Sequence, residues 1–253
     1  MARQARKKSD SDIYHIMMRG INRQIIFEDN EDYNKFLQTL KQYKDISGYQ
    51  IYAYCLMGNH VHLLLKAGNE PLEQIMRRIC GSYVYWYNRK YQRIGNLFQD
   101  RFNSEIVEND SYFLTVIRYI HQNPLKAGLV KSIEEYQWSS FKEYINQLNF
   151  INSDFVLSMF EADKEKAINS FIQFCNIVSD DQCLEMKDKR LLTDPEAINL
   201  IKNVCQIKNP SDLQTLDRAM RNKLLKQLKG EYLLSIRQIE RLTGINRGII
   251  FKA

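Results

Sequence analysis

The ten residues Leu56–Leu65, L-M-G-N-H-V-H-L-L-L, decide the fold. Residues 49–57 alternate like a strand and lead into a glycine-asparagine turn, so the stretch predicts a β-hairpin. Because side chains alternate along a strand, His60 and His62 are expected on one face of it. Two neutral imidazoles side by side can hold one divalent metal ion. Such a pair is also common in ordinary strands, so the interpretation needs support from elsewhere in the chain.

The segments around the hairpin predict the order βαββαβ. This is the order of a ferredoxin-like α+β fold, an antiparallel sheet with helices on one face and the other face open for a ligand. We interpret His15, in the first strand, as a packing residue. The signals for the other elements are a strand over Ile13–Met18, a helix capped by Asp29 or Asn30 and ended by Gly48, a second helix beginning at Pro71, and a fourth strand over residues 97–107.

A further helix, capped by Asn109 or Asp110, follows the fourth strand. At about 100° per residue, Tyr119 projects about 110° from the centre of its apolar stripe. Tyr119 is therefore not expected to be a core tyrosine. On the sequence alone, a buried ring, or a ring on the opposite side of the sheet from the histidines, would end the proposal that Tyr119 is catalytic. Pro124 is expected to end the helix and to bias Asn123 away from helical geometry.

The composition of the 253 residues, 44% hydrophobic and 26% charged, is that of a soluble globular protein of one or two domains. No apolar run reaches the length of a membrane span, and the N-terminus lacks the apolar segment of a secretory signal, so we expect a cytoplasmic protein without a membrane partner. The five cysteines are scattered, which predicts neither disulfides nor a zinc knuckle.

The formal net charge of +6 suits a polyanionic partner, and the basic residues are clustered. Cations that bind phosphates and rings that stack on bases suit single-stranded nucleic acid. The alternative is a solvated helix face with its aromatic side chains turned to the core. The clusters are an N-terminal arm of Arg3, Arg6, Lys7 and Lys8, the preferred phosphate contacts Arg77, Arg89 and Arg101, and the tyrosines Tyr83, Tyr87 and Tyr91 as further binding candidates.

The sequence predicts a first domain over residues 1–150 and an all-α region over residues 151–253. Helices are expected near residues 154–160, 164–175, 195–205 and 212–228. A helix-turn-helix is expected at about residues 231–253, with a cap at Ser235, a turn at Thr243-Gly244, and Asn246, Arg247 and Lys252 facing DNA. A packed helical hairpin without a DNA role is the alternative.

These features together suggest nucleophilic chemistry on DNA. A tyrosine hydroxyl is a poor nucleophile unless its target is electrophilic, and a metal on His60 and His62 would polarise a phosphodiester. Attack by Tyr119 would give a phosphotyrosine link that a second hydroxyl can reverse, which is strand transfer. Two alternatives stay open: a non-catalytic DNA-binding regulator derived from a transposase, and a metal-dependent phosphodiesterase that uses water and does not need Tyr119.

The motifs resemble those of the single-tyrosine HUH transposases, and most of all the branch called REP-associated tyrosine transposases. The resemblance covers residues 1–150 and implies metal ligation by His60 and His62, a 5′-phosphotyrosine through Tyr119, and recognition of single-stranded DNA hairpins. It also implies Mg²⁺ or Mn²⁺ as cofactor, either a monomer or a homodimer, and Asn123 as the third ligand, with His121, Glu105 or water as substitutes. The motifs are G-N-H-V-H from Gly58, R-x-G-x-L-F-x-x-R-F from Arg93, R-Y-I-H-Q-N-P-L-K-A-G around Tyr119, and Y-Q-W-S-S from Tyr136.

Overall fold

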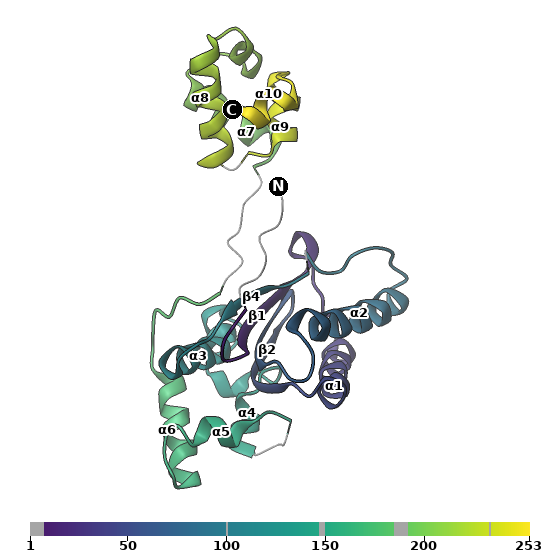
Figure 1. The fold of residues 1–253 in the computed structure, drawn as a ribbon, viewed down its shortest axis with the longest axis vertical. Coiled ribbons are helices and arrows are strands. Elements are labelled where there is room, and N and C mark those ends of the chain that lie inside the picture. Colours follow the sequence, from purple (N-terminus) through teal and green to yellow (C-terminus); the bar gives the residue numbers. More distant parts are fainter. Residues whose placement is uncertain (1–7, 100, 147–149, 185–191, 233) are drawn as a thin grey trace. The chain divides into compact units, whose positions relative to one another are not determined.

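The computed structural model describes residues 8–99, 101–146, 150–184, 192–232 and 234–253. It consists of two compact units, Met1–Met186 and Lys187–Ala253, both drawn in Figure 1. The basic residues Arg3, Arg6 and Lys7 of the predicted N-terminal arm lie outside the described residues.

The first unit is built on a four-stranded antiparallel sheet with the strand order β2-β3-β1-β4. With its helices the chain order is βαββαβ, so the predicted ferredoxin-like α+β fold and its hairpin are confirmed. The fourth strand is shorter than predicted, because Phe98 makes only an isolated bridge to Gly20 before regular pairing begins. The strands are β1 (Ile13–Arg19), β2 (Gln50–Met57), β3 (His60–Lys66) and β4 (Asn103–Ile106).

Helices α1 (Asn30–Ser47) and α2 (Leu72–Lys90) cover one face of the sheet. As predicted, the Asp29 carboxylate caps α1, and Gly48 ends it in the left-handed region at a φ of 67°. The face beneath them is apolar, and the sulfur atoms of Cys80 on α2 and Met18 on β1 lie 3.3 Å apart. This side of the sheet is a hydrophobic core.

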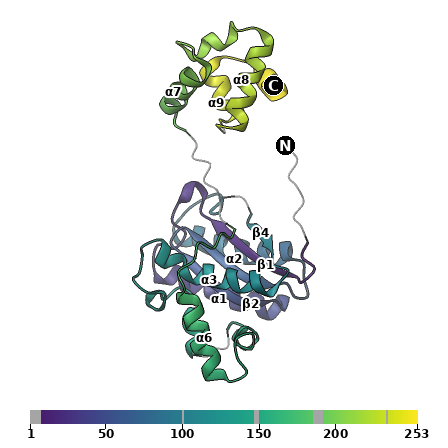
Figure 2. The same ribbon diagram turned by 90° about the vertical axis from the view of Figure 1, so that its left-hand side faces the viewer.

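Helix α3 (Asp110–Lys126) lies on the other face of the sheet, which we expected to be open (Figures 1 and 2). Asn109 caps it by accepting a hydrogen bond from the backbone N–H of Tyr112 at 2.8 Å. The prediction that Pro124 ends the helix is wrong, since α3 continues to Lys126. A proline so close to the C-terminus removes only one hydrogen bond of the last turn, and Asn123 therefore keeps helical geometry.

The first unit extends well beyond residue 150, where we expected a domain boundary. Helix α6 (Lys164–Asn176) packs against α3, and its Phe171 and Cys175 belong to the same buried core as the sheet. The helical pattern after residue 150 therefore marks a second layer on the first unit, and the division falls between Met186 and Lys187. The other short elements of this unit are the 3₁₀ turns Ile21–Arg23 and Ile133–Glu135 and the helices α4 (Phe141–Asn146) and α5 (Ser153–Leu157).

The second unit is all-α and has its own core of buried aliphatic side chains. The helix expected over residues 212–228 is in fact a 3₁₀ turn (Pro210–Gln214) followed by α8 (Arg218–Gly230), because Asp217 caps a new helix. Helices α9 (Ile236–Thr243) and α10 (Arg247–Lys252) follow, with Ser235 as the cap of α9 and Gly244 at a φ of 72°. The unit begins with α7 (Asp194–Cys205). Its helix-turn-helix role in DNA binding stays a prediction.

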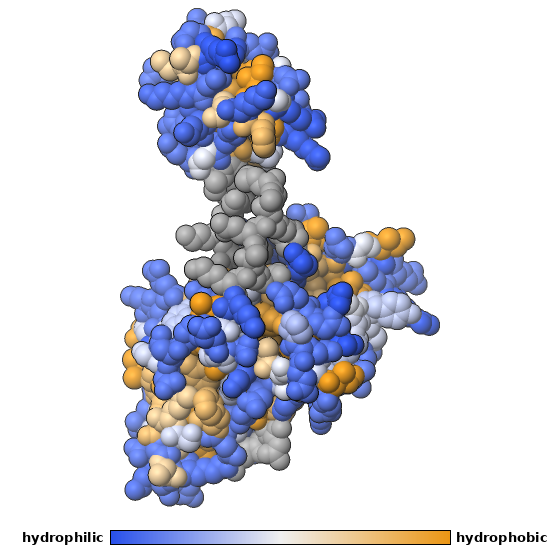
Figure 3. Space-filling model, in the orientation of Figure 1, coloured by the Kyte–Doolittle hydropathy of each residue, from blue (hydrophilic) through white to orange (hydrophobic). Residues whose placement is uncertain are grey.

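Among the described residues no helix has both the length and the apolar character needed to cross a bilayer. Figure 3 shows one face of the molecule, on which hydrophilic side chains cover most of the surface and hydrophobic ones form smaller patches.

Candidate active site

Two histidines of β3 emerge on the face of the sheet that α3 covers. His60 lies opposite Arg19 of β1 and His62 lies opposite Met17, so the strand register places both imidazoles above β1 and β3. Their ring centroids are 5.2 Å apart. His62 is buried and His60 is half-buried near the hairpin turn. Alternation along the strand brings them together as the sequence predicts.

Tyr119 of α3 lies against the same histidines. Its ring centroid is 5.6 Å from that of His62 and 5.8 Å from that of His15, with both pairs in edge-to-face geometry. The predicted nucleophile and the predicted metal-binding pair therefore share one site and come from one chain. This is the spatial arrangement on which the chemistry depends.

The expectation that Tyr119 avoids burial is wrong, since the side chain is only 3% exposed. The ring is buried against His15 and His62, within the candidate site itself. A second segment lies along another part of α3. Gln122 donates hydrogen bonds to the carbonyls of Cys175 and Ile177, and Arg118 donates two to the carboxylate of Asp181 at 2.7 and 2.9 Å. Helix α3 is thus covered by the sheet on one side and by the chain after α6 on another.

Each histidine of the pair uses its Nδ1 atom for a contact within the protein. His60 Nδ1 lies 2.7 Å from Asn59 Oδ1, and His62 Nδ1 lies 3.0 Å from Nε2 of His15. Burial, with smaller contributions from His15 and His60, lowers the pKa of His62 well below its ordinary value, so its imidazole is neutral at pH 7. A histidine held through Nδ1 directs Nε2 away from that contact, which is how metal-binding histidines are usually supported.

The candidates for a third ligand differ in their surroundings. Asn123 lies one turn after Tyr119, and its amide nitrogen donates to the Tyr119 carbonyl at 3.2 Å, which leaves Oδ1 as its donor atom for a metal. His121 is buried on the other side of α3, 2.8 Å from Ser140 Oγ, and burial lowers its pKa to about 3. Glu105 accepts a hydrogen bond from the Tyr112 hydroxyl at 2.5 Å.

Within the described part of the chain, no group of three or more His, Cys, Asp or Glu side chains is arranged to hold a metal ion. The donor set is therefore two imidazoles, to which oxygen atoms of an amide, of water or of a phosphate can be added. An incomplete protein shell of this kind suits an ion that keeps part of its shell for a phosphate substrate, as Mg²⁺ and Mn²⁺ commonly do.

The segment Tyr136–Ser140 fixes α3 over the sheet. The Tyr136 hydroxyl donates to the Leu56 carbonyl at 2.7 Å, and Ser140 Oγ accepts from the Tyr54 N–H at 2.9 Å while it contacts His121. This segment thus connects β2 to the helix that carries Tyr119. The motif was visible in the sequence, but nothing in its composition indicated this positioning role.

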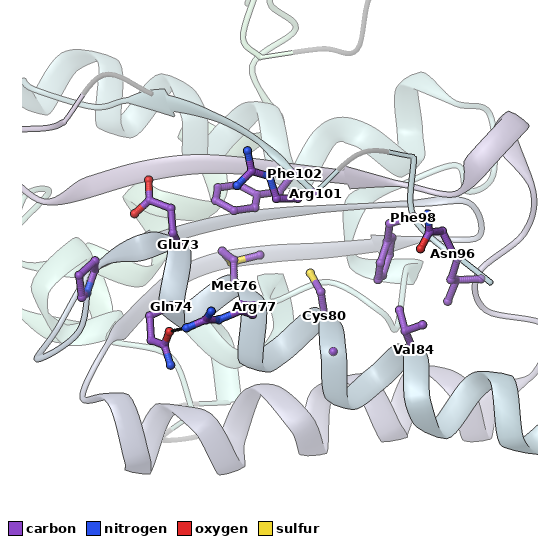
Figure 4. Close-up of a pocket in the computed structure, with 13 residues that line it drawn as sticks. Glu73, Gln74, Met76, Arg77, Cys80, Val84, Asn96, Phe98, Arg101 and Phe102 are labelled. Atoms are coloured by element: carbon purple, nitrogen blue, oxygen red, sulfur yellow. Dashed lines mark hydrogen bonds between the residues drawn. The ribbon is translucent and has the colours of Figure 1, made fainter. Parts of the chain in front are cut away.

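The predicted phosphate contacts lie away from the histidines. Arg77 and Arg101 line a cavity of about 810 Å³ between α2 and the chain that precedes β4 (Figure 4). Its floor is apolar, with Met76, Cys80 and Phe98 among the lining residues. Arg89 lines a second cavity of about 540 Å³ on the outer side of α2.

The other residues that the sequence predicted to bind DNA lie in different surroundings, and some of them are buried. Tyr83 and Tyr87 are buried between α1 and α2, and the Tyr83 hydroxyl donates to the Ile26 carbonyl, so these two rings belong to the core and are not available for stacking. Tyr91 is half-buried and donates to Asp32 Oδ2 at 2.9 Å. Arg247 is exposed at the start of α10, where it forms an ion pair with Glu240.

Comparison with known proteins shows what the first unit is similar to. Residues 8–123, a little under half of the chain, match the family model described as Transposase IS200 like, so this segment is similar to IS200-like transposase domains. The match covers the sheet, both histidines and Tyr119, and it indicates a DNA-processing enzyme of the tyrosine-transposase kind.

Within that class the chain is similar to REP-associated tyrosine transposases, as its motifs indicated. A Haemophilus influenzae protein described as a REP-associated tyrosine transposase is 25% identical over 121 residues, which are 43% of this chain and 68% of that protein. The solved structure of a REP-associated tyrosine transposase bound to a REP hairpin shares the fold, at a TM-score of 0.51 and 16% identity, over 74% of this chain and all of that one. A transposase structure from Deinococcus radiodurans matches at a TM-score of only 0.35 and 18% identity, over 47% of this chain and 96% of that one.

Proposed function

We propose that the chain cleaves and rejoins single-stranded DNA next to hairpins through a 5′-phosphotyrosine on Tyr119. The observation that carries the proposal is the contact of the Tyr119 ring with His62, since the phenol and a neutral imidazole lie on the same side of the sheet in one chain. The relative solved with a REP hairpin supports hairpin DNA as the substrate class.

The reaction exchanges one phosphodiester for another. The Tyr119 hydroxyl oxygen loses its proton to solvent and forms a bond to phosphorus, and the bond from phosphorus to the 3′ oxygen breaks. The departing 3′ oxygen takes up one proton from solvent, so the departing strand ends in a 3′ hydroxyl. A divalent ion held by His60, His62 and Asn123 would polarise the phosphate and offset the charge that develops on it. Attack by another 3′ hydroxyl on the phosphotyrosine restores a phosphodiester and frees Tyr119.

Lys126 has a place in this scheme as a cation close to the proposed nucleophile. Its ammonium group lies 5.5 Å from the centre of the Tyr119 ring. A cation at this distance offsets negative charge on the phenolic oxygen and on an incoming phosphate. Arg77, Arg89 and Arg101 would hold the DNA backbone on the other side of the sheet, and Arg247 would do so on the second unit.

One chain supplies both the phenol and the imidazoles, so cleavage does not require a second subunit to complete the site. We therefore propose that a monomer is competent for cleavage, whether or not a homodimer forms for strand transfer. A single-turnover cleavage rate that is independent of protein concentration, with DNA in limiting amount and fully bound, is the expected result.

A DNA-binding regulator without cleavage is the second candidate, and the burial of Tyr119 favours it. The experiment that separates the two uses end-labelled hairpin DNA with single-stranded flanks, Mn²⁺, and the wild type beside Tyr119→Phe and His62→Ala. We expect a protein-DNA band that resists denaturant for the wild type alone. Binding without any such band would favour the regulator, and cleavage that survives in Tyr119→Phe but not in His62→Ala would point to a phosphodiesterase that uses water.

A further inference from the structure

His15, which we interpreted from the sequence as a packing residue, lies directly behind the candidate metal site. It lies on β1 two residues before Met17 and on the same face of the sheet. Met17 is the residue that pairs with His62. Its Nε2 atom is 3.0 Å from Nδ1 of His62, and the two ring centroids are 5.3 Å apart at an interplanar angle of 30°. Both side chains are buried, so bulk water does not replace this contact.

The contact admits one proton, and its position decides what His62 can do. If His62 Nδ1 donates to His15 Nε2, the Nε2 lone pair of His62 can coordinate a cation. If His15 Nε2 donates, His62 carries its proton on Nε2 and cannot coordinate. A contact of 3.0 Å between two ring nitrogens is a hydrogen bond that holds a single proton, so one of these two arrangements must hold.

The structure assigns His15 as a positioning residue: it accepts the Nδ1 proton of His62 and thereby turns the Nε2 lone pair of His62 toward a divalent cation. The inference rests on the proposed function, because it needs a cation at His60 and His62. It extends that function to a residue outside the paired-histidine motif.

A second feature explains why an imidazole suits this place. A carboxylate, the other usual partner of a metal-binding histidine, would carry a charge in a site where His15 is fully buried. The neutral ring accepts without charge. Its Nδ1 atom is buried and has no hydrogen-bond partner among the described residues, so the only polar contact that we find for His15 there is the one with His62.

Two substitutions distinguish a role of His15 as a hydrogen-bond acceptor from a role in packing alone. His15→Phe keeps the volume and the aromatic edge toward Tyr119 but removes the acceptor, so His62 is expected to move its proton to Nε2 and leave Nδ1 bare. His15→Gln places an amide oxygen near the position of Nε2 and keeps the acceptor. Ile16→Ala, on the opposite face of β1, is the control for a loss of packing.

The readout is Mn²⁺ affinity by calorimetry on the full chain without DNA. We expect His15→Phe to weaken binding about 10- to 100-fold, and His15→Gln and Ile16→Ala to stay close to the wild type. Equal affinity in His15→Phe and wild type, or equal weakness in His15→Phe and His15→Gln, would overturn the assignment. If instead wild type and His62→Ala bind Mn²⁺ alike, the metal site of the proposed function itself fails.

The wild-type protein alone gives an independent test that does not depend on the folding of a variant. With ¹⁵N-labelled histidine and bound Mg²⁺, the proton shared by the two rings should lie on Nδ1 of His62 and give a coupling across the hydrogen bond to Nε2 of His15. A proton found on Nε2 of His62, or on Nε2 of His15 within this contact, would contradict the assignment.

Discussion

The two faces of the sheet use the same strands for different purposes. On the side of α1 and α2, β1 and β3 present apolar side chains such as Ile16 and Leu63, which are fully buried. On the side of α3, the alternate positions of the same strands carry three imidazoles. His62 contacts both His15 and His60, and Tyr119 contacts His15 and His62. The faces are one residue apart in sequence, and on β1 and β3 only the face toward α3 carries histidines.

The difference teaches that burial has opposite consequences on the two faces. Burial of aliphatic carbon stabilises the fold by about 25 cal/mol per Å². Burial of His15 and His62 instead lowers the pKa of both rings, which costs stability at low pH and favours their neutral forms. Neighbouring substitutions on β1 or β3 should therefore give either a stability phenotype or a chemical one.

The largest expected effect is on the chemical face. His60→Ala and His62→Ala should each lower Mn²⁺-dependent cleavage of hairpin DNA at least about 100-fold, because each removes one of two imidazole ligands. Val61→Ala is the matched control, since it lies between them and points to the other face. Comparable loss in all three variants, measured by gel assay of labelled DNA, would remove the distinction between the faces.

The apolar face should give the next effect, on stability alone. Ile16 is fully buried, so Ile16→Ala is expected to lower the free energy of unfolding by about 2–5 kcal/mol. Urea denaturation measures this loss. Mn²⁺ affinity of the folded variant should stay at the wild-type value, and a large drop in affinity would show that the faces are coupled.

The pH dependence of stability should give a smaller effect. Burial lowers the pKa of His121 to about 3, below its ordinary value of 6.5, so between these values the unfolded chain binds a proton that the folded chain does not. Stability is therefore unaffected by His121 above about pH 6.5 and is lost at up to about 1.4 kcal/mol per pH unit below it. Relative to His121→Gln, which keeps a contact to Ser140, the wild type should lose about 1 kcal/mol more between pH 6 and pH 5 in urea denaturation. An equal loss of unfolding free energy in the wild type and in His121→Gln over this pH range would contradict the prediction.

Much of the fold was predictable because the signals are local. The turn before His60, the cap at Asp29 and the glycine at position 48 each fix one element, and the order βαββαβ then limits the arrangement of the sheet. The division between the units was not predictable in this way. It depends on α6 packing against α3, a contact between distant segments that no local pattern reports.

The candidate site shows the same limit. Period-two alternation was enough to place His60 and His62 together. Helical periodicity was not enough to place Tyr119, which was expected outside the core and is buried in it. Neither could reveal that His15 contacts His62, because that contact depends on the register between β1 and β3. Nor could they reveal the burial of Tyr119, which depends on the packing around α3.

The most direct test of the central claim is to identify the residue that becomes linked to DNA. The covalent complex formed with hairpin DNA and Mn²⁺ would be treated with nuclease and trypsin, and the modified peptide sequenced by mass spectrometry. We predict a nucleotide attached through its 5′ phosphate to Tyr119, the phenol beside His62. A nucleotide on Tyr112, which lies on the same helix and donates to Glu105, would contradict the account, as would cleavage without any linked tyrosine.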